Sequence, residues 1–123
     1  MKRGTVPELM FDIIEHAKGV AKNVDKLGAS GPKDEDVLRA AIQWHLVVLG
    51  EISIRLGEPF HAEHPEIPWR RIIDQRNVIA HGYDGVKWNL IANLRQTHIP
   101  DLIEFAQNIL SQYPPPPTTD ETP

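Results

Sequence analysis

The feature that most constrains the fold is a helical pattern from Asp34 to Leu56 that is apolar along two adjacent rows. One row consists of Val37, Ala41, Trp44, Val48 and Ile52, and the other of Leu38, Ile42, Leu49 and Leu56. A helix that is apolar over so much of its circumference must cover that surface with other helices or with another subunit. We therefore expect this helix to lie at the centre of a bundle and to contribute to a homodimer interface.

Apolar residues at steps of three and four predict further helices over residues 9–27, from Pro68 onward and over residues 86–113. Gly28, Gly57 and the prolines of residues 58–68 separate these segments. Pro100 predicts a break near His98 and Ile99, because proline lacks an N–H and disfavours helical geometry in the residue before it. The predicted fold class is all-α, an up-and-down bundle of four to five helices, with one domain over residues 1–113 and a proline-rich tail over residues 114–123.

Composition limits the possible environments and partners of the chain. There is no cysteine, so neither a disulfide framework nor a thiolate zinc site can form. The sequence gives no apolar signal core after Met1-Lys2-Arg3 and no apolar run near the about 20 residues of a membrane span, so we expect a cytoplasmic protein. The net charge of the chain is −4, yet the segment from Trp69 to His98 contains five basic residues and only two acidic ones. Such a local basic zone can attract phosphate.

Three chemically capable side chains, Arg76, His81 and Tyr83, fall within eight residues near the end of the third predicted helix. A guanidinium can hold a phosphate, an imidazole can move protons near neutral pH, and a phenol can carry a covalent group. Arg76 and Tyr83 are seven residues apart and share a helix face, whereas His81 lies about 140° around from Arg76. A single copy of the chain would therefore join Arg76 and His81 only imperfectly.

The segment from Arg76 to Tyr83 resembles the R-x4-H-x-Y motif of the HepT-like branch of the HEPN superfamily. The resemblance extends from about Leu9 to Leu110. It includes the residues 36–41 (Asp-Val-Leu-Arg-Ala-Ala), the pair Gly50-Glu51 and the residues 64–70 (His-Pro-Glu-Ile-Pro-Trp-Arg). A bare R-x4-H pattern would occur by chance in many proteins, but the motif together with these upstream blocks is fairly specific.

The resemblance implies the toxin half of a HEPN/MNT toxin–antitoxin module, a metal-independent endoribonuclease that needs no cofactor. Arg76 and His81 would be catalytic in a composite site where two copies meet, and Asn77 would support them by hydrogen bonding. The implied partners are RNA, a second copy and an MNT-type nucleotidyltransferase. That enzyme would use ATP to attach AMP to Tyr83 and so silence the toxin.

Other residues are weaker candidates. Arg70, Arg71, Lys87 and Arg95 are expected to help bind RNA, and Arg95 interrupts the apolar row of the last helix so that its head could reach a neighbouring site. Asp84 departs from the family pattern, which often has an aromatic residue after the tyrosine. His61 and His64 lie in a proline-flanked segment without a third ligand, so no metal site is expected. His16 lies among polar neighbours and is expected to be a surface residue.

Two other interpretations remain open. In the first, the chain is a non-catalytic HEPN module that binds a nucleotide or a partner. In the second, it is a purely structural dimerisation protein. Arg76 would then pair with Asp74, Glu51 or another acid, His81 would be a residue at the C-terminal end of a helix, and Tyr83 an ordinary half-buried aromatic residue.

Overall fold

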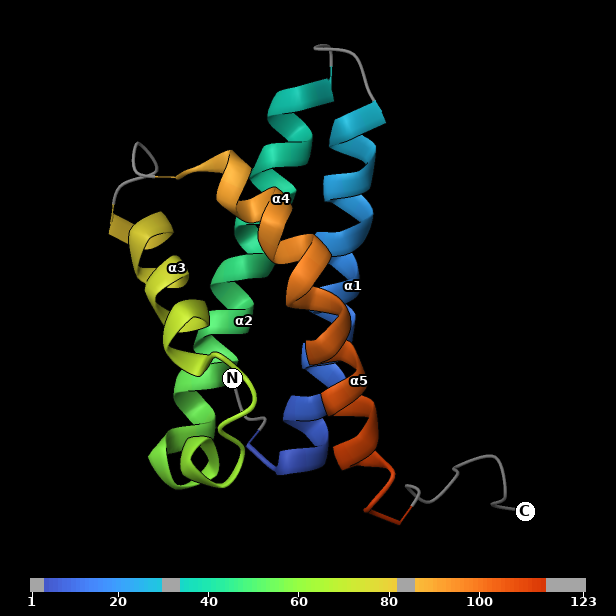
Figure 1. The fold of residues 1–123 in the computed structure, drawn as a ribbon, viewed down its shortest axis with the longest axis vertical. Helices are drawn as coiled ribbons and strands as arrows, with labels where there is room; N and C mark the ends of the chain where they lie inside the picture. The colour runs from blue at the N-terminus through green and yellow to red at the C-terminus, as the bar shows by residue number, and fades with distance from the viewer. Residues whose placement is uncertain (1–3, 30–33, 82–85, 115–123) are drawn as a thin grey trace, which may run out of the picture.

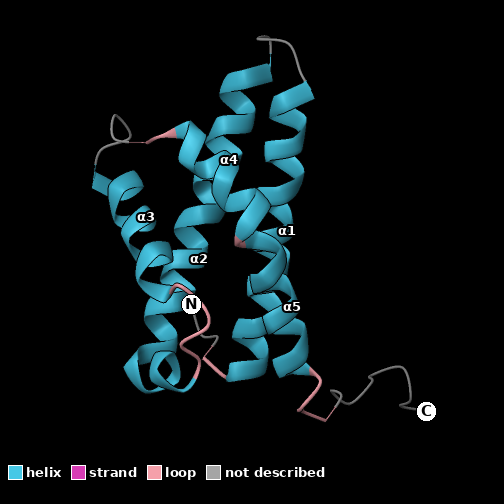
Figure 2. Cartoon of the chain, viewed as in Figure 1, coloured by secondary structure: helices cyan, strands magenta, loops and turns pink. Residues whose placement is uncertain are grey.

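The computed structural model describes residues 4–29, 34–81 and 86–114, and within these ranges every regular element is a helix (Figure 2). The elements are α1 (Val6–Ala29), α2 (Glu35–Glu63), α3 (Trp69–His81), α4 (Trp88–Thr97) and α5 (Ile99–Leu110). This arrangement confirms the predicted all-α bundle.

Helix α2 lies at the centre of the bundle, as expected from its pattern. It packs on α1 along one side and on α3 along another, while α5 covers α1 (Figure 1). The core contains the fully buried side chains of Met10, Ile13 and Ile42. Burial is nevertheless one-sided, because Val37 and Trp44 of α2 are 72% and 59% exposed. The single chain therefore leaves part of the first apolar row exposed, and the homodimer interface expected there stays a prediction.

The C-terminal end of α2 also differs from the prediction. The helix does not stop at Leu56 but continues to Glu63 after a kink at Gly57, whose φ is 86°. A glycine adopts this left-handed conformation without steric cost, and Pro59 fits the first turn of the segment that follows. The connection to α3 is thus only residues 64–68.

The predicted break at Pro100 is confirmed. Helix α4 ends at Thr97 and α5 begins at Ile99, so that Pro100 occupies the first turn of α5. A proline at this position costs little, because its missing N–H would have had no partner within the helix. The N–H of His98 donates to the carbonyl of Leu94 and closes the last turn of α4 at 2.9 Å.

Arg95 fastens α4 to α1. Its Nε and Nη2 each donate a hydrogen bond of 2.9 Å to the carboxylate of Asp25. These bonds lower the pKa of Asp25 below its usual value, because they favour the charged carboxylate. The head of Arg95 therefore points to α1 in this structure.

His16 is not a simple surface residue, which corrects the sequence-based expectation. Its Nδ1 lies 2.9 Å from Nδ1 of His45 on α2, and its ring meets Trp44 edge-on at 5.0 Å between centroids. Burial lowers the pKa of both imidazoles, because desolvation disfavours the charged form. The two rings form a polar contact between α1 and α2.

By length and composition alone, α2 could cross a membrane, which corrects the expectation that the chain contains no apolar run of that length. The core helix of a water-exposed bundle has the same properties. The packing of α2 against α1 and α3 fits the core helix of such a bundle.

Candidate active site

Arg76 projects from α3 at a place where α3 comes close to α2 at a glycine. A Cβ added to Gly50 would overlap Cβ of Arg76, and it would lie 2.7 Å from Cγ of Arg76 and 3.3 Å from the carbonyl oxygen of Ile72. Gly50 is buried in α2. Because Gly50 has no side chain, Cβ and Cγ of Arg76 can pack directly against α2 at this position.

The guanidinium of Arg76 is held from two sides. Its Nε and Nη2 donate to Oε2 of Glu51 at 3.0 and 2.5 Å, and its Nη1 donates to Oδ1 of Asn77 at 2.8 Å. A guanidinium carries five N–H donors, so these three bonds leave two for another acceptor. Such an arrangement fixes the direction of the fork while keeping part of its capacity for a phosphate oxygen.

Glu51 is one of the acids that the sequence offers as a partner of Arg76, and the structure selects it. Asp74 lies about 160° around α3 from Arg76 and cannot share its face. The Arg76 side chain is 26% exposed and that of Glu51 is 47% exposed. An ion pair this open to water adds at most about 1 kcal/mol to stability, so its main physical effect is to orient the guanidinium.

His81 is the last residue of α3 and is exposed. Within the described ranges its imidazole has no hydrogen bond or ion pair. On an ideal helix it lies about 140° around and about 7.5 Å along the axis from Arg76. Within one chain, helix geometry thus separates His81 from Arg76. Tyr83 and Asp84 lie outside the described residues.

The four basic residues expected to bind RNA do not gather around Arg76. Arg95 is bound to Asp25 of α1, and Arg71 faces a groove between α3 and α4. Arg70 and Lys87 are exposed at the start of α3 and just before α4. Their roles remain predictions.

An exposed apolar surface lies next to the Arg76–Glu51 pair. We call Val37, Trp44, Glu51 and Ile54 the outer stripe of α2, since their spacing places them on one helix face. Ile54 is 48% exposed, and Val37 and Trp44 are more so. A pocket of about 460 Å³ lies beside Glu51, between α1 and α2. The residue that orients Arg76 thus belongs to an uncovered apolar face.

His61 has a structural role that its sequence context did not reveal. Its Nε2 lies 2.7 Å from the carbonyl oxygen of Ser53, and its ring stacks on Trp69 with centroids 4.9 Å apart. In the part of the chain that the structure describes, no three potential metal ligands cluster together.

Comparison with known proteins gives a consistent family. The model of the family described as "Ribonuclease HepT-like" matches residues 10–109. "Putative RNase MJ1380" of Methanocaldococcus jannaschii is 24% identical over 83% of this chain and 94% of its own length. "Putative RNase TTE0752" of Caldanaerobacter subterraneus is 28% identical over 81% and 83%. "Probable ribonuclease HepT" of Thermococcus cleftensis is 35% identical over 46% and 52%. No solved structure matches.

Proposed function

Because this chain belongs to the HepT-like ribonuclease family, we propose that it is a metal-independent endoribonuclease and the toxin of a toxin–antitoxin pair. Its active site would be a composite of Arg76 and His81 from two copies. This proposal rests on the hydrogen bonds from Arg76 to Glu51 and Asn77. They orient the guanidinium beside an exposed apolar face of α2. RNA would be the substrate, and the cytoplasm its location.

The chemistry is an internal transfer within RNA. The ribose 2′-oxygen attacks the adjacent phosphorus while its proton passes to one imidazole. The bond from phosphorus to the 5′-oxygen breaks, and a second imidazole gives that oxygen a proton. The products are a 2′,3′-cyclic phosphate and a 5′-hydroxyl. Arg76 would stabilise the charge that develops on the non-bridging oxygens.

A dimer supplies what one chain lacks. One imidazole cannot easily serve both the attacking and the leaving oxygen, and His81 of a single chain lies away from Arg76 around the helix. Covering the outer stripe of α2 with a second copy would remove its apolar side chains from water. Because Glu51 belongs to this stripe and contacts Arg76, the same contact would bring two arginines together.

Cleavage of RNA in excess EDTA tests the reaction class. We expect purified protein to cut RNA under chelation and to leave fragments that end in 2′,3′-cyclic phosphate. The same RNA with 2′-O-methyl groups throughout should stay intact, because it has no nucleophile. Cleavage that needs added Mg²⁺, or that also cuts the methylated RNA, would contradict the mechanism.

We further propose that a partner nucleotidyltransferase silences the protein by attaching AMP to Tyr83. The added phosphate would be a ligand for Arg76, and the base would obstruct the RNA cleft. Tyr83→Phe should therefore still arrest growth when expressed alone, and should resist rescue by the co-expressed partner. Equal rescue of Tyr83→Phe and of the unmodified sequence would instead favour silencing by complex formation.

The pairing of Arg76 with Glu51 also favours one competing interpretation, a purely structural role for the arginine. That role predicts a loss of thermal stability in Arg76→Ala without any effect on RNA. The non-catalytic binding module predicts normal ligand binding in His81→Ala. Both differ from the proposed ribonuclease in the chelated RNA assay.

A further inference from the structure

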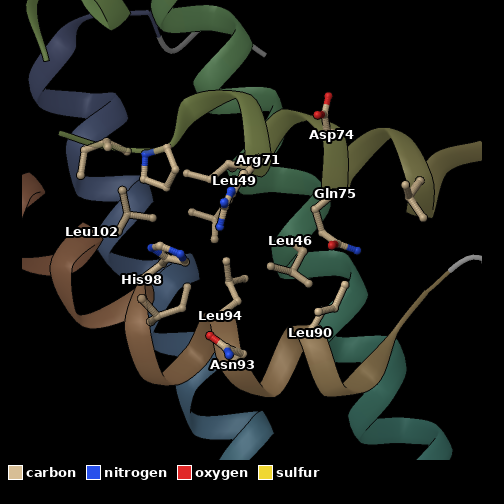
Figure 3. Close-up of a pocket in the computed structure, with 15 residues that line it drawn as sticks. Leu46, Leu49, Arg71, Asp74, Gln75, Leu90, Asn93, Leu94, His98 and Leu102 are labelled. Carbon is tan, nitrogen blue, oxygen red and sulfur yellow. The ribbon is translucent and has the colours of Figure 1, made fainter. Parts of the chain in front are cut away.

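A second hollow lies on another side of α3, away from Arg76. It occupies about 490 Å³ between α3 and the α4–α5 pair. Its apolar floor includes Leu46 and Leu49 of α2. Leu94 of α4 and Leu102 of α5 line the wall that faces α3 (Figure 3). We call it the α3–α4 groove. Its volume is in the usual range for sites that bind small molecules.

Two nitrogen-bearing side chains point into this groove from opposite walls. Figure 3 shows Arg71 reaching in from α3 and His98 from the junction of α4 and α5, whereas Asp74 points away. Neither the guanidinium nor the imidazole has a hydrogen bond or ion pair with any of the residues that the structure describes. The remaining polar groups at the edge are the amides of Gln75 and Asn93. The groove therefore offers unpaired donors above an apolar floor.

We propose that the α3–α4 groove binds a small amphipathic anion. Its apolar part would lie on Leu46, Leu49 and Leu102, and its carboxylate or phosphate head would accept hydrogen bonds from the guanidinium of Arg71, with the imidazole of His98 as a second polar contact. An apolar groove without a charged side chain would not distinguish between ligands with different head groups. A cationic surface without an apolar groove would bind anions that have no apolar part. The combination is what specifies an amphipathic anion.

This inference does not depend on the proposed ribonuclease, because the groove contains neither Arg76 nor His81. The two sites are nevertheless connected through α3. That helix packs chiefly on α2, so a ligand held between Arg71 and Leu102 would add a link from α3 to α5.

Three probes with the same eight-carbon chain separate the contributions. Octanoate carries a carboxylate, octyl phosphate a phosphate, and octanol no charge. In an NMR titration of the full chain we expect at least one anion to shift the amide signals of residues 71–78 and 90–102, and octanol to bind more weakly. The stronger anion identifies the preferred head group.

Arg71→Met keeps the apolar stem and removes the charge, and Arg70→Met, at the preceding residue and outside the groove, is the matched control. We expect Arg71→Met to weaken binding of the preferred anion about tenfold, as for one lost charge-assisted hydrogen bond. Octanol binding to Arg71→Met and anion binding to Arg70→Met should be unchanged. Equal binding of anions and octanol, wild-type anion affinity in Arg71→Met, or shifts confined to the outer stripe of α2 would overturn the proposal. The proposal would also be overturned if a second copy of the chain, and not a probe, occupied the α3–α4 groove.

Discussion

Removing either motif side chain is expected to reduce RNA cleavage by about 10²–10³-fold. Arg76→Ala takes away a preorganised cation at the transition state, and His81→Ala takes away a proton-transfer group. The melting temperature of both variants should stay close to that of the wild type, because the Arg76–Glu51 pair is open to water and His81 is exposed. The measurement is a cleavage time course in EDTA with circular dichroism on the same samples.

Arg70→Ala is the matched control for the arginine. Arg70 lies on the same helix, is exposed, and has no ion pair within the described ranges. If it contributes only to RNA affinity, its loss should raise the concentration of RNA needed without abolishing cleavage. Arg76→Ala with unchanged cleavage and a lower melting temperature would establish the structural interpretation instead.

Gly50→Ala is expected to be among the most damaging small substitutions in the chain. The new methyl group would meet Cβ of Arg76, which is tied to the backbone and cannot rotate away, so α3 has to move. Overpacking of this kind costs about 1–3 kcal/mol of folding free energy. Thermal denaturation should show the loss, and RNA cleavage should fall as well because Arg76 shifts relative to Glu51.

Gly28→Ala provides the control for Gly50→Ala. An added Cβ there has nothing within 4 Å, although Gly28 is also helical. Alanine has the higher helix propensity, so this variant should be neutral or up to about 1 kcal/mol more stable. A Gly50→Ala protein that melts and cleaves like the wild type would show that the close approach of α2 and α3 has no functional role.

Local rules predicted most of the helices. Pro100 separates α4 from α5 because its effect on backbone hydrogen bonding does not depend on the rest of the fold. Gly57 misled the prediction because a glycine can end a helix or merely bend it, and only tertiary packing decides which. The exposure of Val37 and Trp44 could not be read from periodicity, which reports apolarity but not what covers it.

The residues of the candidate site stay a prediction from the sequence, whereas the contacts of Arg76 come from the structure alone. The sequence offered Glu51 as one of several partners for Arg76, and the choice depends on how α2 and α3 pack. The contact between His16 and His45 joins residues far apart in sequence, so no local pattern indicates it. The α3–α4 groove has the same origin, since its walls come from separate helices.

RNA cleavage by mixed dimers tests the composite site most directly. One copy carries Arg76→Ala and the other His81→Ala, with different affinity tags so that only the mixed species is purified. We expect the mixed dimer to cleave RNA above the level of either mutant homodimer, because one intact arginine and one intact histidine meet across the interface, and below the wild-type level, because the second imidazole is missing. A reference dimer pairs wild type with the double variant. If only this reference dimer were active, or if the protein cleaved RNA as a monomer, the site would lie within one chain and the composite account would be wrong.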